Sequence, residues 1–330
     1  MDSVFLGTTG VRVSRLAMGT MSFGGDADEE MSRALFARAR DAGINLFDCA
    51  DVYAGGRSEE ILGRLIAGCR DEVVITSKVY FPTGADGNAR GSSRYHIVRA
   101  AEASLRRLNT DRIDIYFLHR FDDYTDLEDT LRGLELLVQQ GKILYPAVSN
   151  FAAWQIARAL GVAERHGWAR VACVQPMYNL VKRQAEVEIL PLCAAERLGC
   201  LPYSPLGGGL LSGKYGATRR PSAGRLVDNA MYATRYGERS NYDIADALCA
   251  IAREIGEPPA ALAIAWVAAH PAVTAPLIGA RNLEQLDVCL RAADIDMTPE
   301  LRARLSALSP EPPPATDRNE ERTEHNYGAR

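Results

Sequence analysis

Short apolar runs alternate along this chain with longer segments in which apolar residues recur every three or four positions. The short runs are rich in β-branched residues and predict eight strand cores, over residues 16–19, 45–49, 73–77, 113–118, 143–148, 171–174, 200–203 and 275–278. The longer segments have helical periodicity, as over 93–108 and 127–140. Such regular alternation indicates βαβ units and a parallel sheet.

The number of units distinguishes between two parallel-sheet architectures. An open doubly wound sheet usually carries a glycine-rich phosphate turn after its first strand, and no GxGxxG sequence follows residues 16–20. We therefore predict an α/β fold, a single (β/α)₈ TIM barrel over residues 1–308. A hairpin over 4–13 closes the bottom of the barrel, long loops follow the third and seventh strands at 80–92 and 207–240, and a polar, proline-containing tail occupies 309–330.

Glycine and proline add local expectations. Gly43, Gly141 and Gly199 each stand between a predicted helix and the next strand, where a left-handed helix cap is expected. Pro146 falls inside the fifth strand and cannot donate to the sheet, so we expect a bulge there.

Composition and charge restrict the classes of partner. The chain has 330 residues, with 38 lysines and arginines against 42 aspartates and glutamates, and its arginines are scattered. No apolar stretch approaches the roughly 20 residues that span a bilayer, and no leader-like segment opens the chain. We expect a cytoplasmic protein that binds neither nucleic acid nor membrane. Seven cysteines without a CxxC pair predict reduced thiols and no metal site.

Polar side chains end three consecutive strands, where a packed barrel interior should be apolar. Asp48 ends the second strand and Tyr53 follows it, Lys78 ends the third, and His119 ends the fourth. Neighbouring strands lie about 4.8 Å apart, so these groups can meet. We expect Lys78 to lower the pKa of the Tyr53 phenol, Asp48 to keep Lys78 charged, and His119 to orient a substrate oxygen or share in proton transfer.

Each of these residues also has a purely structural interpretation. Asp48 with Lys78 alone would more often be a structural ion pair, His119 alone an interior histidine, and Tyr53 alone loop packing. Stability does not require all of them at neighbouring strand ends, however, and function concentrates on that face of a barrel. Their joint placement therefore favours a site for proton transfer.

Four short motifs carry a resemblance to a known family. They are FDCADVY at 47–53, SEEILG at 58–63, GKI at 141–143 and VSNF at 148–151. With these motifs in order, the chain resembles an aldo-keto reductase over nearly its whole length. The resemblance implies NADPH-dependent reduction of a carbonyl to an alcohol, with Asp48, Tyr53, Lys78 and His119 as the catalytic tetrad and Tyr53 as general acid.

The same resemblance implies where the cofactor binds. Arg281 stands where it could pair with a 2′-phosphate, which favours NADPH. Cys289 departs from the pattern, because the family usually has an asparagine for adenine there. The implied cofactor-binding residues are Thr20, Met21, Asp48, Ser149, Asn150, Gln175, Tyr203, Ser204, Pro205, Leu206, Gly207, Gly209, Lys214, Gly279, Arg281 and Gln285.

Two other functions are compatible with parts of the sequence. The chain also resembles the barrel-type β subunits of potassium channels, which suggests a cofactor-binding, redox-sensing subunit with slow turnover; His119 favours the enzyme. A metal-dependent barrel hydrolase is disfavoured because no predicted strand carries an HxH pair. The expected partner is a small carbonyl compound: an aldehyde, a ketone, a keto-sugar or a natural-product intermediate. A homo-oligomer is equally compatible with the sequence.

Overall fold

The computed structural model describes residues 1–325. The last five residues of the tail predicted over 309–330 lie outside the described residues. In the described part of the chain, no helix is long and apolar enough to cross a membrane.

Eight parallel strands form one curved sheet, and each corresponds to a predicted strand core. Their order around the sheet is β10-β3-β4-β5-β6-β7-β8-β9. The Leu277 backbone N–H donates to the Pro202 carbonyl at 2.8 Å, and this bond joins the two ends of the sheet. The predicted barrel is therefore confirmed, with strands β3 (Ala17–Gly19), β4 (Leu46–Asp48), β5 (Val74–Val79), β6 (Ile113–Leu118), β7 (Ile143–Ser149), β8 (Cys173–Gln175), β9 (Gly199–Cys200) and β10 (Leu277–Ile278).

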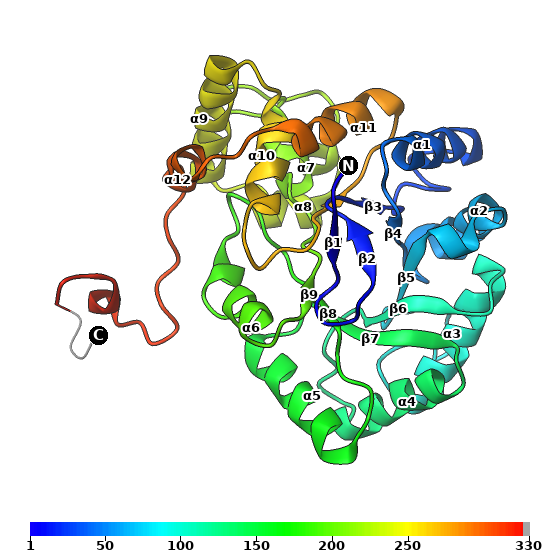
Figure 1. Ribbon diagram of the computed structural model, residues 1–330. Coiled ribbons are helices and arrows are strands. Elements are labelled where there is room, and N and C mark those ends of the chain that lie inside the picture. The colour runs from blue at the N-terminus through cyan, green and yellow to red at the C-terminus, as the bar shows by residue number, and fades with distance from the viewer. Residues whose placement is uncertain (326–330) are drawn as a thin grey trace.

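Helices surround the sheet (Figure 1) and begin where side chains cap them. Asp28, Ser93 and Asp126 each accept a hydrogen bond from a backbone N–H of the first turn that follows. The α-helices are α1 (Glu29–Asp41), α2 (Arg57–Ile66), α3 (Arg94–Leu108), α4 (Leu127–Gln139), α5 (Ala153–His166), α6 (Ile189–Ala195), α7 (Arg225–Asp228), α8 (Ala230–Tyr236), α9 (Arg239–Ile255), α10 (Pro259–Ala268), α11 (Leu283–Leu290) and α12 (Pro299–Ser306). Short 3₁₀ helices are η1 (Tyr53–Gly56), η2 (Arg70–Glu72), η3 (Gln184–Glu186), η4 (Gly207–Ser212), η5 (Arg291–Asp294) and η6 (Asn319–Arg322).

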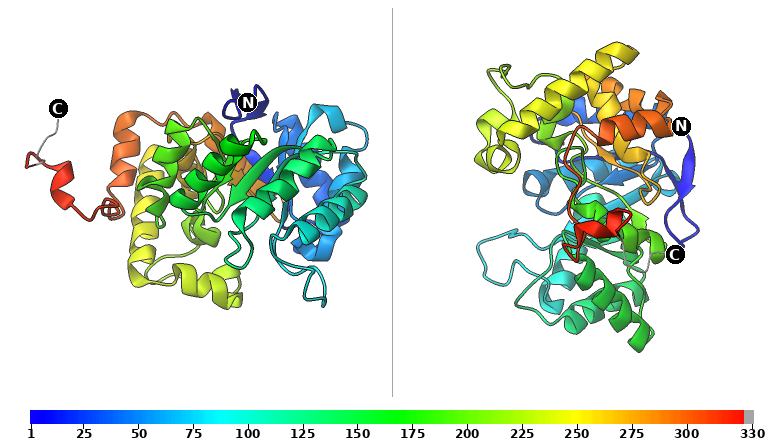
Figure 2. Two further views of the ribbon diagram at one scale, coloured as in Figure 1. Left: turned by 90° about the horizontal axis from the view of Figure 1, so that it is seen from below. Right: turned by 90° about the vertical axis from the view of Figure 1, so that its left-hand side faces the viewer.

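The predicted hairpin closes one end of the barrel. It consists of β1 (Ser3–Phe5) and β2 (Arg12–Ser14), which pair antiparallel. Leu6 and Val13 belong to the same buried cluster as Ile115 and Phe117 from inside the barrel. Figure 2 shows the hairpin at one end of the molecule and the 80–92 loop at the other. The hairpin thus covers the end of the barrel opposite the 80–92 loop.

One of the three predicted glycine caps is wrong. Gly43 and Gly141 have the expected positive φ, at 87° and 69°. Gly199 instead lies in β9, and Arg197 takes the left-handed conformation, with φ 50°. A Cβ at position 199 would lie 2.5 Å from Leu6 Cδ1, so Gly199 is required by the hairpin that packs against it.

The expected bulge at Pro146 is also wrong. β7 pairs with β6 in unbroken register, with Tyr116 opposite Pro146. The Pro146 carbonyl accepts from the Ala172 N–H, just before the start of β8. The carbonyl and nitrogen of one residue face the same neighbouring strand, so the proline nitrogen faces the β8 side and not β6. The proline therefore leaves the β6–β7 pairing intact.

The two long loops differ from each other. Residues 80–92 lack helix and strand, as predicted. The predicted 207–240 loop instead contains η4, α7, α8 and the start of α9, so its description as a loop is wrong. Leu226, Tyr232 and Tyr236 are buried there, and these contacts hold the short helices. All seven cysteines are free thiols, as expected. Beyond α12, the tail extends away from the barrel (Figure 1).

Candidate active site

Polar groups from β4, β5 and β6 meet at the carboxyl end of the barrel. Lys78 of β5 donates from Nζ to Asp48 Oδ2 at 2.6 Å, to the Cys49 carbonyl at 2.8 Å and to Tyr53 Oη at 3.3 Å. The Tyr53 and His119 rings meet edge to face, with centroids 6.2 Å apart. The structure therefore brings the four predicted side chains into one cluster.

The second carboxylate oxygen of Asp48, the one that does not contact Lys78, is also held by hydrogen bonds. Its Oδ1 atom accepts from Thr76 Oγ1 at 2.7 Å and from Gln175 Nε2 at 2.8 Å. The carboxylate is 2% exposed, so these bonds and Lys78 replace water entirely. One of the two amide N–H groups of Gln175 is thus committed to Asp48.

Lys78 keeps its charge although it is fully buried. Burial lowers the pKa of Lys78, but the charge of Asp48, the Asp48 hydrogen bond and the nearby Tyr53 and Cys49 together outweigh burial and raise this pKa to about 12. Asp48 is the carboxylate paired with Lys78, at 2.6 Å. A permanent cation therefore lies one hydrogen bond from the Tyr53 phenol.

The expectation that Lys78 lowers the Tyr53 pKa below its ordinary value is wrong. Burial raises the pKa of Tyr53 to about 12, and Lys78 opposes this shift without cancelling it. The phenol consequently keeps its proton at neutral pH. It remains a proton donor, and the nearby ammonium would stabilise the phenolate that donation leaves behind.

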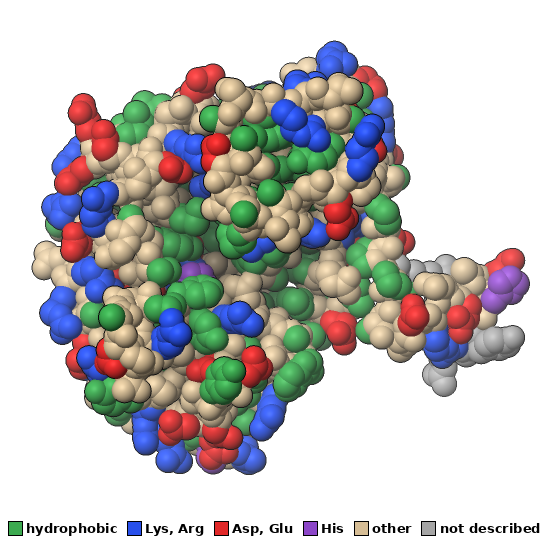
Figure 3. Space-filling view, turned by 180° about the vertical axis from the view of Figure 1, so that it is seen from behind, with side chains coloured by type: hydrophobic (Ala, Val, Ile, Leu, Met, Phe, Trp, Pro, Cys, Tyr) green, Lys and Arg blue, Asp and Glu red, His purple; other side chains and the backbone are tan. Residues whose placement is uncertain are grey.

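His119 is a neutral imidazole. Burial, followed by the charge of Lys78, lowers its pKa well below the ordinary value. Its ring packs edge to face against Phe81, with centroids 4.9 Å apart, and Nδ1 is buried without a hydrogen-bond partner. Seen from the side opposite the hairpin, a histidine lies in a hollow among hydrophobic side chains (Figure 3). A neutral imidazole in such surroundings can hydrogen-bond a substrate oxygen.

A chain of hydrogen bonds connects the ends of β7, β8 and the segment after β9. Tyr203 Oη donates to Asn150 Oδ1 at 2.7 Å, and Asn150 Nδ2 donates to Ser149 Oγ at 3.1 Å. Ser149 Oγ donates to the Gln175 carbonyl at 2.9 Å. Four of the residues predicted to hold the nicotinamide therefore lie side by side, and the half-buried Tyr203 ring is fixed at its hydroxyl.

Two other residues predicted for the nicotinamide are placed differently. The Thr20 hydroxyl is buried, donates to the Asp48 carbonyl at 3.0 Å and lies 2.9 Å from Ser58 Oγ. The Thr20 backbone N–H and carbonyl are also bonded within the chain. Met21 is 41% exposed. Thr20 therefore holds β3 and α2 together and presents no free polar atom.

Cations converge beyond the glycines of η4. Gly207, Gly208 and Gly209 all have positive φ, and a Cβ at Gly209 would lie 3.9 Å from Lys214 Nζ. Burial, Arg281 and Arg225 lower the pKa of Lys214. Neither Lys214 nor Arg225 has an ion-pair partner in the described part of the chain. This arrangement of turn and cations suits a phosphate group.

Arg281 is tethered at the same end of the site. Its Nε atom contacts Asp26 Oδ2 at 2.9 Å, and its backbone N–H donates to Gln285 Oε1 at 3.1 Å. Cys289 is 3% exposed and packs in the hydrophobic core, so it offers nothing to an adenine ring. Among the remaining predicted residues, Ser204 has φ 56° and its carbonyl accepts from Asn179 Nδ2. Pro205 and Leu206 precede η4, and Gly279 follows β10.

Sequence reasoning missed three residues near the site. Arg225 and Asp26 contribute charge to the phosphate end, but both lie in segments with no motif. Asp51 is 2% exposed, and neither carboxyl oxygen has a hydrogen-bond partner. Burial, followed by the charge of Glu59, raises the pKa of Asp51 to about 7. The signal for Asp51 was its place in the FDCADVY motif.

Comparison with known proteins gives consistent matches. The sequence model described as the aldo/keto reductase family matches residues 15–310. The uncharacterized oxidoreductase YrpG of Bacillus subtilis is 38% identical over 94% of this chain and 97% of its own length. A probable voltage-gated potassium channel subunit beta of Oryza sativa is 36% identical, over 94% and 98%. The versiconal hemiacetal acetate reductase of Aspergillus parasiticus is 30% identical, over 91% and 94%.

Proposed function

The chain belongs to the aldo/keto reductase family, and from this premise we propose that it reduces a small carbonyl compound to an alcohol with NADPH. Family membership and relatives named as oxidoreductases support carbonyl reduction in general. The observation that carries the specific proposal is the Lys78 ammonium, which contacts both Asp48 and the Tyr53 hydroxyl at the open end of the barrel.

The residues present fit a phosphorylated nicotinamide cofactor. When bound, NADPH supplies the hydride. The η4 glycines and the unpaired Lys214 and Arg225 would hold its phosphates, and Tyr203 with Asn150 would flank its ring. Arg281 supports the preference for NADPH, because its partly exposed guanidinium could pair with a 2′-phosphate.

The chain's own groups provide the proton. Tyr53 is protonated at neutral pH and would donate to the carbonyl oxygen as hydride arrives at carbon. Lys78 would stabilise the resulting phenolate, and Asp48 with Gln175 and Thr76 would keep Lys78 in place. Neutral His119 would donate a hydrogen bond to the same oxygen and orient it.

Replacing Tyr53 with Phe tests this assignment. The variant removes only the hydroxyl, so NADPH binding should remain within a few-fold while turnover falls by roughly 10²–10⁴. Turnover equal to that of the wild type would refute the role of Tyr53 as general acid.

A second function is a redox-sensing subunit with slow turnover. It is favoured by relatives named as potassium channel β subunits in Oryza sativa and Arabidopsis thaliana. Steady-state turnover across aldehydes, ketones and keto-sugars separates the two. If the protein binds the cofactor but no carbonyl compound supports more than a single slow turnover, the result favours the sensor.

We also propose a domain division and a compartment. Residues 1–308 would form one domain and 309–330 a peripheral tail, because the hydrophobic cores draw on residues no later than 308. Seven free thiols suit the reducing cytoplasm.

A further inference from the structure

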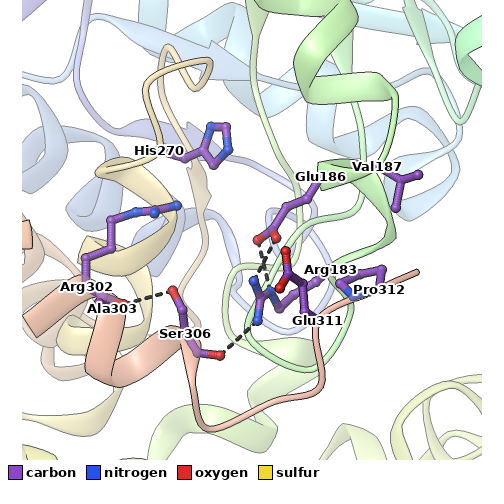
Figure 4. A pocket seen from close by; sticks show the side chains of 9 residues that line it. All are labelled: Arg183, Glu186, Val187, His270, Arg302, Ala303, Ser306, Glu311 and Pro312. Carbon is purple, nitrogen blue, oxygen red and sulfur yellow. Dashed lines mark hydrogen bonds and ion pairs between the residues drawn. The ribbon is translucent and has the colours of Figure 1, made fainter. Parts of the chain in front are cut away.

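A cavity on the side of the barrel uses none of the candidate active-site residues. Its volume is about 500 Å³, a size typical of small-molecule sites. It lies between η3, the end of α10, α12 and the first residues after α12 (Figure 4). Arg183, Glu186, His270, Arg302, Ser306 and Glu311 supply its polar lining.

One arginine of this cavity is already neutralised. Arg183 makes two contacts with Glu186, from Nε at 3.0 Å and from Nη2 at 2.8 Å, and it also donates to the Ser306 carbonyl at 2.8 Å. Tyr178 adds a 2.6 Å bond to the same carboxylate. The Arg183–Glu186 pair therefore forms a rigid wall with no net charge.

Arg302 is different, because its charge has no anionic partner in the described part of the chain. Its guanidinium lies 5.6 Å from the Trp266 ring centroid, and Nε is buried without a hydrogen-bond partner. A buried guanidinium N–H without an acceptor costs free energy. The aromatic face holds the side chain in position and leaves its N–H groups directed into the cavity (Figure 4).

His270 presents a second donor to the same space. Its Nδ1 accepts from the Ala272 N–H at 3.2 Å, so the neutral ring carries its proton on Nε2. Burial and the charge of Arg302 lower the pKa of His270, which keeps the ring neutral. In Figure 4 the His270 ring and the Arg302 guanidinium lie at the same end of the cavity.

We propose that this cavity binds a small organic anion, whose carboxylate or phosphate oxygens accept from Arg302 and from His270 Nε2. Arg302 Nε is a buried donor without a partner, His270 Nε2 lies at the same end of the cavity, and arginine favours planar, bidentate recognition of carboxylate and phosphate groups. The volume exceeds that of a bare oxyanion, so the ligand carries a further organic part, which the Arg183–Glu186 wall would contact. The site goes beyond the proposed reduction and does not depend on it.

The test is equilibrium dialysis with radiolabelled inorganic phosphate and, separately, with radiolabelled malonate. The full chain is saturated with NADP⁺ so that the cofactor's phosphate positions are filled, and chloride keeps the ionic strength constant. We expect one saturable equivalent of at least one of the two anions per chain. Binding of phosphate alone identifies a phosphorylated ligand, and binding of malonate a carboxylate.

Matched variants assign the site. Arg302→Gln should weaken binding on the order of ten-fold or more, the loss expected for a charge-assisted hydrogen bond, and Arg302→Lys should retain part of it. Arg304→Gln is the control, because Arg304 lies on the same helix but pairs with Glu254 on the exposed side.

Three results would overturn the proposal. The first is that neither anion shows saturable binding. The second is that an Arg302→Gln variant, shown by its melting temperature to be folded, binds the anion as tightly as the wild type. The third is that the Arg302→Gln and Arg304→Gln variants lose the same amount of affinity.

Discussion

Asp51 gives the most quantitative prediction of the structure, because a carboxyl group is buried there without a hydrogen-bond partner. Burial and the neighbouring charge of Glu59 raise its pKa from 3.8 to about 7. The Tyr116 hydroxyl also lacks a partner, and burial, followed by the negative charge of Asp51, raises the pKa of that phenol. Ionised Asp51 is therefore unfavourable in the folded state.

The sign of the pH dependence follows from proton binding. Between about pH 4 and pH 7 the folded protein holds a proton on Asp51 that the unfolded chain has released, so stability falls as pH rises through this window. The full shift of about 3 units corresponds to about 4 kcal/mol. About 2.5 kcal/mol of it falls between pH 5 and pH 8.

Asp51→Asn removes this titration and leaves the other groups in place. We expect the unfolding free energy of the variant, relative to the wild type, to rise by about 2.5 kcal/mol from pH 5 to pH 8. Urea denaturation followed by far-UV circular dichroism at several pH values measures it. Asp123→Asn, at an exposed carboxylate, is the control and should show no such trend. A difference between Asp51→Asn and wild type that stays constant over this range would refute the reasoning.

Four further predictions concern the site and the fold. Lys78→Met should abolish turnover and cost roughly 3–5 kcal/mol of stability, because Asp48 is left as an unpaired buried charge; activity and denaturation assays check both. Arg281→Met should weaken NADPH binding by ten-fold or more with little change for NADH, as fluorescence titration would show. Because the pKa of Tyr53 is about 12, loss of its proton should not slow reduction below about pH 10. A pH–rate profile at saturating substrate tests this. Gly199→Val should destabilise the protein by several kcal/mol in a thermal or urea melt, because its side chain would collide with Leu6.

The architecture could be predicted from sequence because strand and helix periodicities are local. Each predicted strand core contains or overlaps a strand, and 113–118 matches β6 in full. The short helices of 207–240 could not be predicted in this way. They contain many glycines and arginines, and α8 is held by the burial of Tyr232 and Tyr236 against distant residues.

The sequence could predict which residues form the candidate site, but not their pKa values or their hydrogen-bond partners. Asp48, Tyr53, Lys78 and His119 lie at or shortly after the carboxyl ends of neighbouring strands, so topology places them together. The raised pKa of Tyr53 depends on burial by the whole fold, which the sequence does not reveal. The same holds for Thr20, whose hydroxyl is used by Ser58 and Asp48, and for Asp26, which reaches Arg281 across the chain.

The most direct test of the proposed function compares NADPH oxidation by the wild type and by the Tyr53→Phe variant across a panel of aldehydes, ketones and keto-sugars. Absorbance at the nicotinamide band is followed, and the alcohol is quantified by mass spectrometry. The account predicts that the wild type forms one alcohol per NADPH consumed, and that the variant binds NADPH with similar affinity but forms alcohol at least 10²-fold more slowly. Equal rates of alcohol formation by the two proteins, or no carbonyl reduced by a wild type that binds NADPH, would contradict it.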